Sequence, residues 1–186
     1  MRIIGVTGGT GGGKTTVTKI LKEQGAHIVD ADVVARKVVA SGCPALSEIA
    51  ARWDVVRDGV LDRKALAKIV FSDESQLHKL NGIVHKYVIE EIKSQLADCK
   101  KEIFVIDAIA LFESGLADLC DVTVAVIADR DVRCKRIMAR DGLTKDEALM
   151  RINAQKSDEF YINGADVVIY NNDNDEIEQI IKRELM

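Results

Sequence analysis

The sequence predicts an α/β fold in which a parallel five-stranded sheet is flanked by helices. Three observations support it: short Val/Ile-rich runs recur along the chain, segments with helical spacing separate them, and a glycine-rich loop joins the first run to the first helix. Nearly unbroken apolar runs suit strands that are buried on both faces of a parallel sheet. The predicted strands are 2–7, 26–31, 102–108, 121–128 and 165–171.

Composition and charge narrow the functional class. The chain has 186 residues and a formal net charge of −4, and only 4% of its residues are aromatic. Nucleic-acid binders are more often basic and stack bases on interleaved aromatic side chains, so this class is disfavoured. The apolar runs fall short of the ~18 residues that a membrane-spanning helix requires. We therefore expect one globular domain with small insertions and no nucleic-acid or membrane partner; the oligomeric state stays open.

The cysteines indicate the redox compartment. Cys43, Cys99, Cys120 and Cys134 lack the spacing of a zinc site, and the segment "MRIIGVTGG" lacks the apolar core of a signal peptide. We expect a cytoplasmic protein whose thiols stay reduced, with each cysteine acting as a small buried hydrophobe.

Two helical stretches interrupt the strand pattern. Residues 44–98 contain no convincing strand and read as three helices, over 44–53, 62–71 and 74–97. A second helical stretch, 129–160, precedes the last strand and contains a capping box from Thr144 to Glu147. The plan is an α/β core with two helical attachments.

A glycine-rich loop follows the first predicted strand. Residues 8–15 fit the pattern G-x-x-x-x-G-K-[ST] and open a predicted helix over 14–24, the context in which this motif binds phosphate. Successive backbone N–H groups wrap the phosphate, and the positive end of the helix adds to their field. A glycine-rich turn with a chance lysine is the alternative, which the flanking strand and helix disfavour.

The residues of this loop have distinct expected tasks. Side chains at Gly11, Gly12 or Gly13 would crowd the phosphate or forbid the required backbone angles. Lys14 reaches the β- and γ-phosphates of ATP, and the Thr15 hydroxyl ligates Mg²⁺. The expected ATP contacts are Gly11, Gly12, Gly13, Lys14, Thr15 and Thr16. The patterns N-K-x-D and D-x-x-G of a GTPase switch do not occur in the sequence, which leaves a kinase or a less typical ATPase.

Two aspartates close the second predicted strand. Asp30 and Asp32 are two residues apart, so both carboxylates share one face if the strand continues through them. A carboxylate at this edge of a parallel sheet can orient an acceptor hydroxyl and take its proton. Alternatively, Asp32 caps the helix that follows. Arg36, one turn later, can bind an anionic substrate group or lie on the surface.

Candidate metal ligands are few. Asp107 ends the predicted strand 102–108 and can hold Mg²⁺ through water, or else is a strand-end turn residue. His78 and His85 lie seven residues apart without Cys, Asp or Glu at metal-ligand spacing, so they make a poor zinc site. His85 can still donate a hydrogen bond to a substrate.

Basic residues outnumber acidic ones in 129–156, against the balance of the whole chain. Arg133, Arg136 and Arg140 are spaced three and four apart and share one helical stripe. Arginines that close over a transferring phosphoryl group stabilise its charge and exclude water. A solvated helix face is the alternative.

The combined pattern resembles the dephospho-CoA kinase family, whose members phosphorylate the ribose 3′-hydroxyl of dephospho-CoA in the last step of coenzyme A synthesis. The likeness covers nearly the whole chain. The P-loop is shared by many families, whereas the D-A-D-x-x-A-R, L-D-R-x-x-L and L-F-E stretches together are much more specific. The matching segments are "GVTGGTGGGKTTV", "VDADVVAR", "GVLDRKALAKIVF", "LNGIVHKYV", "VIDAIALFESGL", "RIMARDGLTKDEALMRINAQ" and "GADVVIYNN".

This resemblance implies a P-loop NTPase core, a helical CoA-binding insertion and a helical lid, with ATP as phosphate donor and Mg²⁺ as cofactor. The core would span 1–43, 101–128 and 161–186, the insertion 44–100, and the lid 129–160. The implied site residues are Asp32 as catalytic base, Arg36, His85 and Glu113 near dephospho-CoA, and Arg136 and Arg140 near the phosphates.

The sequence departs from the family pattern at several positions. In the loop, Thr10, Gly12 and Thr15 replace the usual isoleucine and serines; the threonine keeps the Mg²⁺-binding hydroxyl, and the extra glycine is expected to loosen the loop. Lys86 replaces a proline, which removes a constraint on a helix entry. Ile109 replaces another proline and is expected to shift its segment, which affects the substrate contacts more than the reaction.

Two alternatives to this kinase remain. One is a kinase with the same core that acts on nucleosides or nucleoside monophosphates. The other is a regulatory module that hydrolyses ATP slowly and that no small acceptor stimulates. The paired aspartates, the helical insertion and the basic stretch together favour an acceptor site and disfavour the module.

Overall fold

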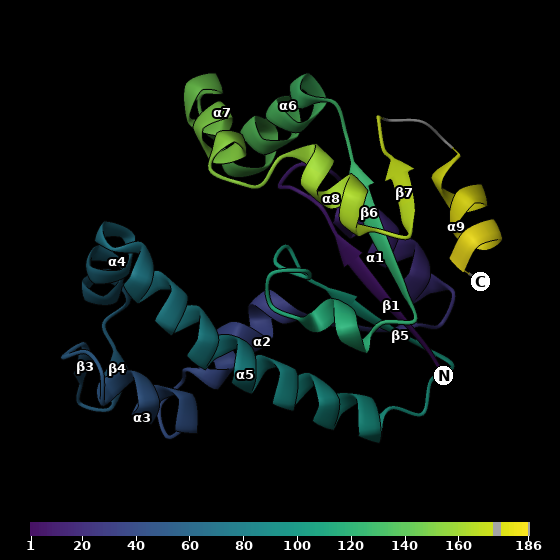
Figure 1. Cartoon of the computed structure of the whole chain (residues 1–186). Coiled ribbons are helices and arrows are strands. Elements are labelled where there is room, and N and C mark those ends of the chain that lie inside the picture. Colours follow the sequence, from purple (N-terminus) through teal and green to yellow (C-terminus); the bar gives the residue numbers. More distant parts are fainter. Residues whose placement is uncertain (173–175, 186) are drawn as a thin grey trace. The chain divides into compact units, whose positions relative to one another are not determined.

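A computed structural model describes residues 1–172 and 176–185 of the chain. Contacts between Cα atoms divide the chain into two compact units. The first unit comprises Met1–Val29 and Lys100–Met186, and the second comprises Asp30–Cys99 (Figure 1). Residues 173–175 and 186, at the end of the predicted core, lie outside the described residues.

A five-stranded sheet forms the centre of the first unit. Its strand order is β2-β5-β1-β6-β7, and β1 pairs in parallel with both β5 and β6, as β6 does with β7. The predicted sheet and its five strands are therefore confirmed, each to within two residues at either end. The strands are β1 (Arg2–Thr7), β2 (His27–Asp30), β5 (Ile103–Asp107), β6 (Val122–Ile127) and β7 (Val167–Tyr170).

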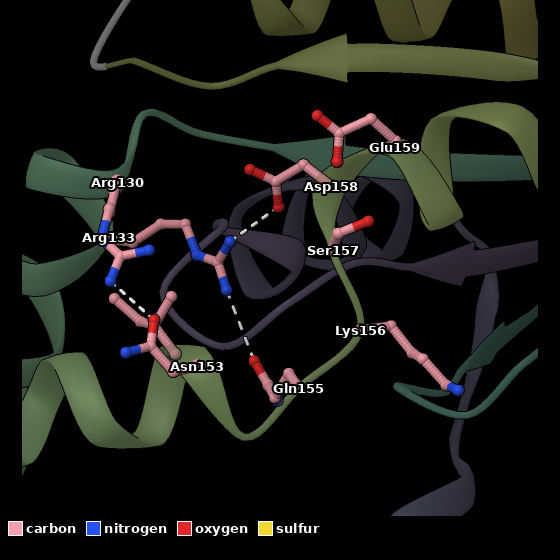
Figure 2. Close-up of a pocket in the computed structure, with 9 residues that line it drawn as sticks. Arg130, Arg133, Asn153, Gln155, Lys156, Ser157, Asp158 and Glu159 are labelled. Carbon is pink, nitrogen blue, oxygen red and sulfur yellow. Dashed lines mark hydrogen bonds and ion pairs between the residues drawn. The ribbon is translucent and has the colours of Figure 1, made fainter.

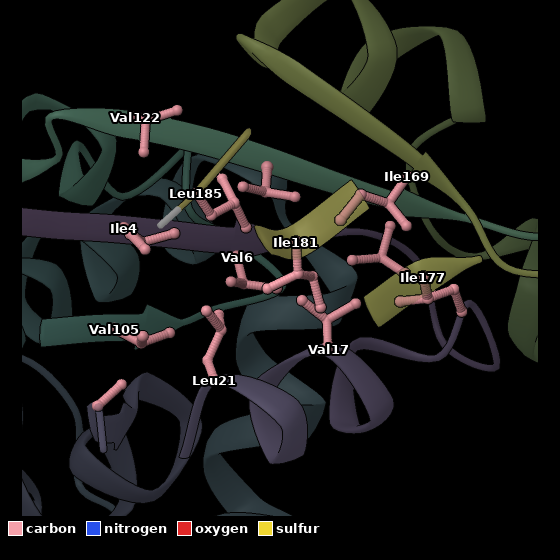
Figure 3. Packing of buried hydrophobic residues seen from close by; sticks show 13 residues of the cluster. Ile4, Val6, Val17, Leu21, Val105, Val122, Ile169, Ile177, Ile181 and Leu185 are labelled. Carbon is pink, nitrogen blue, oxygen red and sulfur yellow. The ribbon is translucent and has the colours of Figure 1, made fainter. Parts of the chain in front are cut away.

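Helices cover both faces of this sheet. On one face, α1 (Lys14–Glu23) and α9 (Ile177–Leu185) pack against the apolar side chains of the strands. Figure 3 shows Val17 and Leu21 of α1 and Ile181 of α9 meeting Val6 of β1 in this core. On the other face, α8 (Asp158–Gly164) places Tyr161 against β6. Burial on both faces explains why the strands are almost purely apolar.

Two further helices, α6 (Arg130–Asp141) and α7 (Lys145–Asn153), have a small core of their own. The predicted capping box at the start of α7 is confirmed. The Thr144 hydroxyl accepts from the Glu147 N–H at 3.3 Å, and the Glu147 carboxylate accepts from the Thr144 N–H at 2.8 Å. A short 3₁₀ helix, η1 (Leu116–Leu119), lies between β5 and β6.

The second unit is a group of helices arranged on one long member. The helix α5 (Glu74–Asp98) contacts α2 (Ala31–Val38), α3 (Pro44–Ala50) and α4 (Arg63–Ser72). The predicted helices of this stretch are confirmed, and their apolar sides form a separate core. Trp53 is buried in this core and donates a hydrogen bond from Nε1 to the Gln76 side chain at 3.0 Å.

The expectation of no strand in 44–98 is wrong. The strands β3 (Val56–Arg57) and β4 (Val60–Leu61) form a short antiparallel hairpin. Asp58 and Gly59 both have positive φ, at 51° and 74°, which matches the backbone of a two-residue hairpin turn. The Asp-Gly pair between apolar residues is the signal that would have predicted it.

The cysteines are free thiols. Cys134 is buried as expected, whereas the other three are only partly buried. Burial, aided by nearby acids, raises the pKa of Cys120 to about 12, so this thiol stays protonated. Among the helices of the described part of the chain, none has the length and apolarity that a membrane crossing demands.

Candidate active site

The predicted sequence of strand, glycine loop and helix is confirmed. Residues 8–13 leave β1 and enter α1, with Gly13 as the N-cap of the helix. Gly11 and Gly13 have φ of 77° and 95°, a region that side chains disfavour, so the expected backbone constraint at these positions holds. At Gly12 a Cβ would lie 2.7 Å from the Val126 carbonyl oxygen, which leaves no room for a side chain.

The N-terminal end of α1, which follows the loop, is suited to bind an anion. Its first turn, Lys14, Thr15 and Thr16, contains no acidic residue, and Gly13 offers no side chain to cap the first N–H groups. The N-terminal N–H groups of α1 and their partial positive charge therefore favour a negative ligand. Lys14 lies across the loop, since its Nζ donates to the Gly8 carbonyl oxygen at 3.2 Å.

Arg136 binds both the glycine loop and the side chain of Asn171. Arg136 donates from Nη1 to the Gly11 carbonyl oxygen and from Nη2 to Asn171 Oδ1, both at 3.2 Å. Asn171 is only 3% exposed, and its Nδ2 has no hydrogen-bond partner in the described part of the chain. A Cβ at Gly13 would lie 1.9 Å from this Nδ2, which gives Gly13 a second reason to lack a side chain. The loop therefore packs against Arg136 of α6 and against Asn171, the residue that follows β7.

The alternative of a solvated helix face is wrong for Arg133. This side chain is 4% exposed, and its Nη1 donates to Asp158 Oδ1 at 2.7 Å. Its Nε donates to the Thr10 carbonyl oxygen at 2.9 Å. Arg133, Gln155 and Asp158 line a cavity of about 330 Å³. Figure 2 shows the Arg133 guanidinium between the Gln155 and Asp158 side chains. Arg133 therefore contacts the loop backbone as a buried residue.

Arg140 lies at the exposed end of the same stripe. Its Nε and Nη2 donate to the two carboxylate oxygens of Asp141, each at 2.8 Å, and Nη2 also lies 3.4 Å from Thr10 Oγ1. The hydrogen bond to Asp141 raises the pKa of Arg140, and the same contact lowers the pKa of Asp141. The predicted stripe of Arg133, Arg136 and Arg140 thus faces the loop along its whole length.

The two predicted magnesium ligands, Thr15 and Asp107, both offer oxygen atoms. Thr15 is exposed on the first turn of α1, and Asp107 ends β5 in register with Val6 of β1. Hydroxyl and carboxylate oxygens are the hard ligands that Mg²⁺ prefers. Within residues 1–172 and 176–185, His, Cys, Asp and Glu nowhere gather in a group of three that could hold a metal. These donors fit an ion held chiefly by phosphate and water, with one or two protein ligands.

Asp30 and Asp32 lie at the junction of β2 and α2, in different positions. The strand ends at Asp30 and α2 begins at Ala31, so the expected alternation along a strand does not apply. Asp30, not Asp32, is the N-cap: its Oδ1 accepts from the Val33 N–H at 3.0 Å. Asp32 is exposed on the first turn of α2, and Arg36 is exposed one turn later on the same helix.

Comparison with known proteins identifies the family. The family model described as dephospho-CoA kinase matches residues 2–177. The chain belongs to the dephospho-CoA kinase family. The dephospho-CoA kinase of Moorella thermoacetica is 48% identical over 162 residues, which cover 83% of this chain and 76% of that protein.

Two solved structures are similar to this chain over nearly its whole length. A crystal structure of a Thermus thermophilus protein aligns with 100% of this chain and 98% of its own, at 31% identity and a TM-score of 0.82. The dephospho-CoA kinase from Campylobacter jejuni aligns with 98% of this chain and 95% of its own, at 25% identity and a TM-score of 0.67.

Lys86, one of the positions that depart from the family pattern, fits its surroundings. Lys86 lies in the interior of α5 rather than at a helix entry, so a residue with an N–H suits it better than proline. Its Nζ donates to Glu48 Oε1 at 3.0 Å, and the Tyr87 hydroxyl donates to the same oxygen at 2.6 Å. His85 precedes this pair and is half-buried.

Glu113, in the segment that follows β5, is exposed. Burial raises the pKa of the Tyr161 hydroxyl, and the charge of Glu113 raises it further, so these two side chains interact electrostatically. The preceding Phe112 packs on α8, with its ring edge-to-face against Phe160 at a centroid distance of 6.0 Å. The L-F-E segment is therefore anchored to the first unit by its phenylalanine and presents its acid to solvent.

Sequence reasoning missed three polar residues that contact the loop or its partners: Gln155, Asp158 and Asn171. Gln155 Oε1 accepts from the Thr10 N–H at 2.7 Å. Asn171 had one available signal, since it follows the last strand at the carboxyl edge of the sheet, where ligands bind. Gln155 lies between α7 and α8 and Asp158 begins α8, and their contacts depend on tertiary structure alone.

Proposed function

We propose that this protein is a kinase that transfers the γ-phosphoryl group of ATP to the ribose 3′-hydroxyl of dephospho-CoA, giving coenzyme A and ADP. The phosphate-binding loop between β1 and α1 is the observation that carries the proposal. It combines left-handed glycines, a helix N-terminus and a lysine in one segment. Membership of the dephospho-CoA kinase family supports the choice of acceptor.

The loop side of the site holds the nucleotide. Lys14 and the backbone N–H groups from Gly11 to Thr16 bind the phosphates of ATP, in the manner of other P-loops. Thr15, and Asp107 through water, would hold a Mg²⁺ ion, which would neutralise part of the negative charge of the phosphates. Positive charge from the loop, the helix end and the lysine stabilises the transferring group in the transition state.

The acceptor is activated by Asp32 in this proposal. Asp32 comes two residues after the end of β2 in the chain, and its exposed position on α2 suits contact with a substrate hydroxyl. Its carboxylate orients the 3′-hydroxyl and takes its proton as the oxygen attacks phosphorus. Asp30 is less suited because its carboxylate caps α2.

Three residues bind the rest of dephospho-CoA in this proposal: Arg36, His85 and Glu113. Arg36 offers a positive charge to an anionic group of the substrate. The helical insertion 44–100 serves as the CoA-binding part, and the segment 129–160 as the lid. The core, 1–43, 101–128 and 161–186, then carries the nucleotide.

The arginines of α6 serve the transferring group. Arg136 reaches the loop at Gly11, and Arg140 reaches it at Thr10, so both guanidinium groups lie beside the segment that holds the phosphates. Their charge would stabilise the phosphoryl group and help to exclude water during transfer. We further propose that the enzyme acts in the cytoplasm on small molecules alone, consistent with its free thiols and acidic net charge.

The experiment is the release of ADP from ATP and Mg²⁺, measured with dephospho-CoA, with adenosine, with AMP and without an acceptor. We expect strong stimulation by dephospho-CoA alone. Equal or greater stimulation by adenosine or AMP would assign the acceptor site to nucleosides or nucleotides. Turnover that no acceptor changes would indicate a regulatory ATPase instead.

A further inference from the structure

The peptide of Thr10, in the middle of the glycine loop, is held on both sides. Its N–H donates to Gln155 Oε1 at 2.7 Å, and its carbonyl oxygen accepts from Arg133 Nε at 2.9 Å. Both partners lie in the chain between β6 and β7, outside the strand, loop and helix that form the phosphate site. The loop is therefore restrained by a segment far away in the sequence.

The restraining side chains are themselves fixed. Arg133 is 4% exposed and donates from Nη1 to Asp158 Oδ1 at 2.7 Å, while its Nη2 lies 3.4 Å from Gln155 Oε1 (Figure 2). A buried guanidinium needs such a carboxylate, because an unpaired buried charge is strongly destabilising. Asp158 thus fixes Arg133, and Arg133 contacts both Gln155 and the loop.

The glycines on either side of Thr10 make room for this arrangement. A Cβ at Gly9 would lie 2.2 Å from Arg133 Nη2 and 3.2 Å from Gln155 Oε1. A Cβ at Gly11 would lie 2.8 Å from the Arg133 carbonyl oxygen. These two glycines are therefore required by close packing of the protein on itself, besides any contact with phosphate.

We propose that Gln155, Arg133 and Asp158, together the Thr10 clamp, are positioning residues that preorganise the loop for ATP. A glycine-rich segment has many accessible conformations, and a ligand that orders it loses affinity by that entropy. The clamp orders the central peptide before the nucleotide arrives. The inference rests on the proposed function only in taking the loop as the nucleotide site; it does not depend on the identity of the acceptor.

The test compares Gln155→Ala with two controls in the full-length chain. Titration calorimetry gives the Kd for ADP with Mg²⁺ and the Kd for dephospho-CoA. In Gln155→Ala we expect the Kd for ADP to rise about tenfold, the effect of one lost hydrogen bond, with the Kd for dephospho-CoA unchanged. Gln155→Glu keeps an oxygen that accepts from Thr10 and should restore most of the ADP affinity.

The second control is Asn153→Ala. Asn153 lines the same cavity, but its side chain accepts a hydrogen bond from Arg130 rather than from the loop. This variant should leave both affinities unchanged. The proposal is overturned if Gln155→Ala binds ADP like the wild type, or if both ligands weaken together in step with a lower Tm. A wild-type chain that does not bind ADP would overturn the nucleotide site itself, and the proposed function with it.

Discussion

At the scale of single residues, the position of a carboxylate relative to a helix start decides its role. Asp30 and Asp32 are chemically identical and two residues apart, yet one accepts a backbone N–H at the N-cap and the other lies exposed on the first turn. The sequence predicted the pair but could not rank its members, because the strand end and the helix start differ by a single residue.

Substitution by asparagine separates these two roles. Asparagine caps a helix as well as aspartate does, so Asp30→Asn should keep wild-type stability and activity. Asp32→Asn loses the base and should lower kcat by a factor of about 10² to 10⁴ with dephospho-CoA as acceptor. Steady-state kinetics of both variants, with Tm as a folding control, make the comparison. A larger loss of kcat in Asp30→Asn would reverse the assignment.

Two glycines with a left-handed backbone, one in the loop and one just after α1, differ in whether a side chain would fit. Gly13 and Gly25 share a left-handed backbone, with φ of 95° and 94°, but a Cβ at Gly13 meets Asn171 whereas one at Gly25 has open space. We expect Gly25→Ala to lose about 1–2 kcal/mol of unfolding free energy from backbone strain alone. Gly13→Ala should lose more than this and bind ADP poorly. Equal losses by chemical denaturation would show that Asn171 yields to the methyl group.

At the scale of elements, the sequence predicted the segments whose own residues specify their structure. It did not predict features that depend on contacts with distant segments. Four consecutive residues are enough to predict the capping box of α7, and the apolar runs are enough to predict the strands. The hairpin β3–β4 was missed because each strand has only two residues, too few to show a periodicity. Arg133 was placed on the right stripe, but its burial needed Asp158 on another helix.

The capping box gives a test at this scale. Thr144→Ala removes the side-chain acceptor of the first turn of α7 and should cost about 1 kcal/mol of helix stability. We expect faster amide hydrogen exchange within Lys145–Asn153 and little change in α8. The matched control is Ser157→Ala, which removes the cap of α8, where the Ser157 hydroxyl accepts from the Phe160 N–H. Exchange that rises equally in both helices in either variant would show that they do not open separately.

At the scale of the whole molecule, the order of strands and helices was predictable because parallel strands buried on both faces must read as apolar runs joined by helices. The α/β class, the loop and the place of the helical stretches followed from it. The clamp on Thr10 and the contact of Asn171 with Gly13 were not predictable, because they join segments more than 120 residues apart in the sequence. Arg133 and Thr10, for example, are 123 residues apart.

The acid sensitivity of the fold can be tested at Asp166, beside β7. Thr123 of β6 donates from its hydroxyl and its N–H to Asp166 Oδ2, at 2.7 and 2.8 Å, and these bonds lower the pKa of Asp166. A lowered folded-state pKa adds stability that is present above the unfolded value, about 3.9, and lost as pH falls through the folded value. Asp166→Asn should therefore lose less unfolding free energy than the wild type between pH 5 and pH 3.

Urea denaturation at several pH values measures this dependence. Thr123→Val, which removes the donating hydroxyl, should flatten the same part of the profile. An unchanged profile in both variants would assign the acid sensitivity to other carboxylates.

The most direct measurement of the central claim follows the phosphoryl group itself. The protein is incubated with [γ-³²P]ATP, Mg²⁺ and dephospho-CoA, and the labelled product is treated with a nuclease specific for 3′-phosphates. We predict label in coenzyme A that this nuclease releases completely, and no label in coenzyme A when Lys14 is replaced by alanine. Label found only as inorganic phosphate, or on a hydroxyl other than the ribose 3′-hydroxyl, would contradict the account.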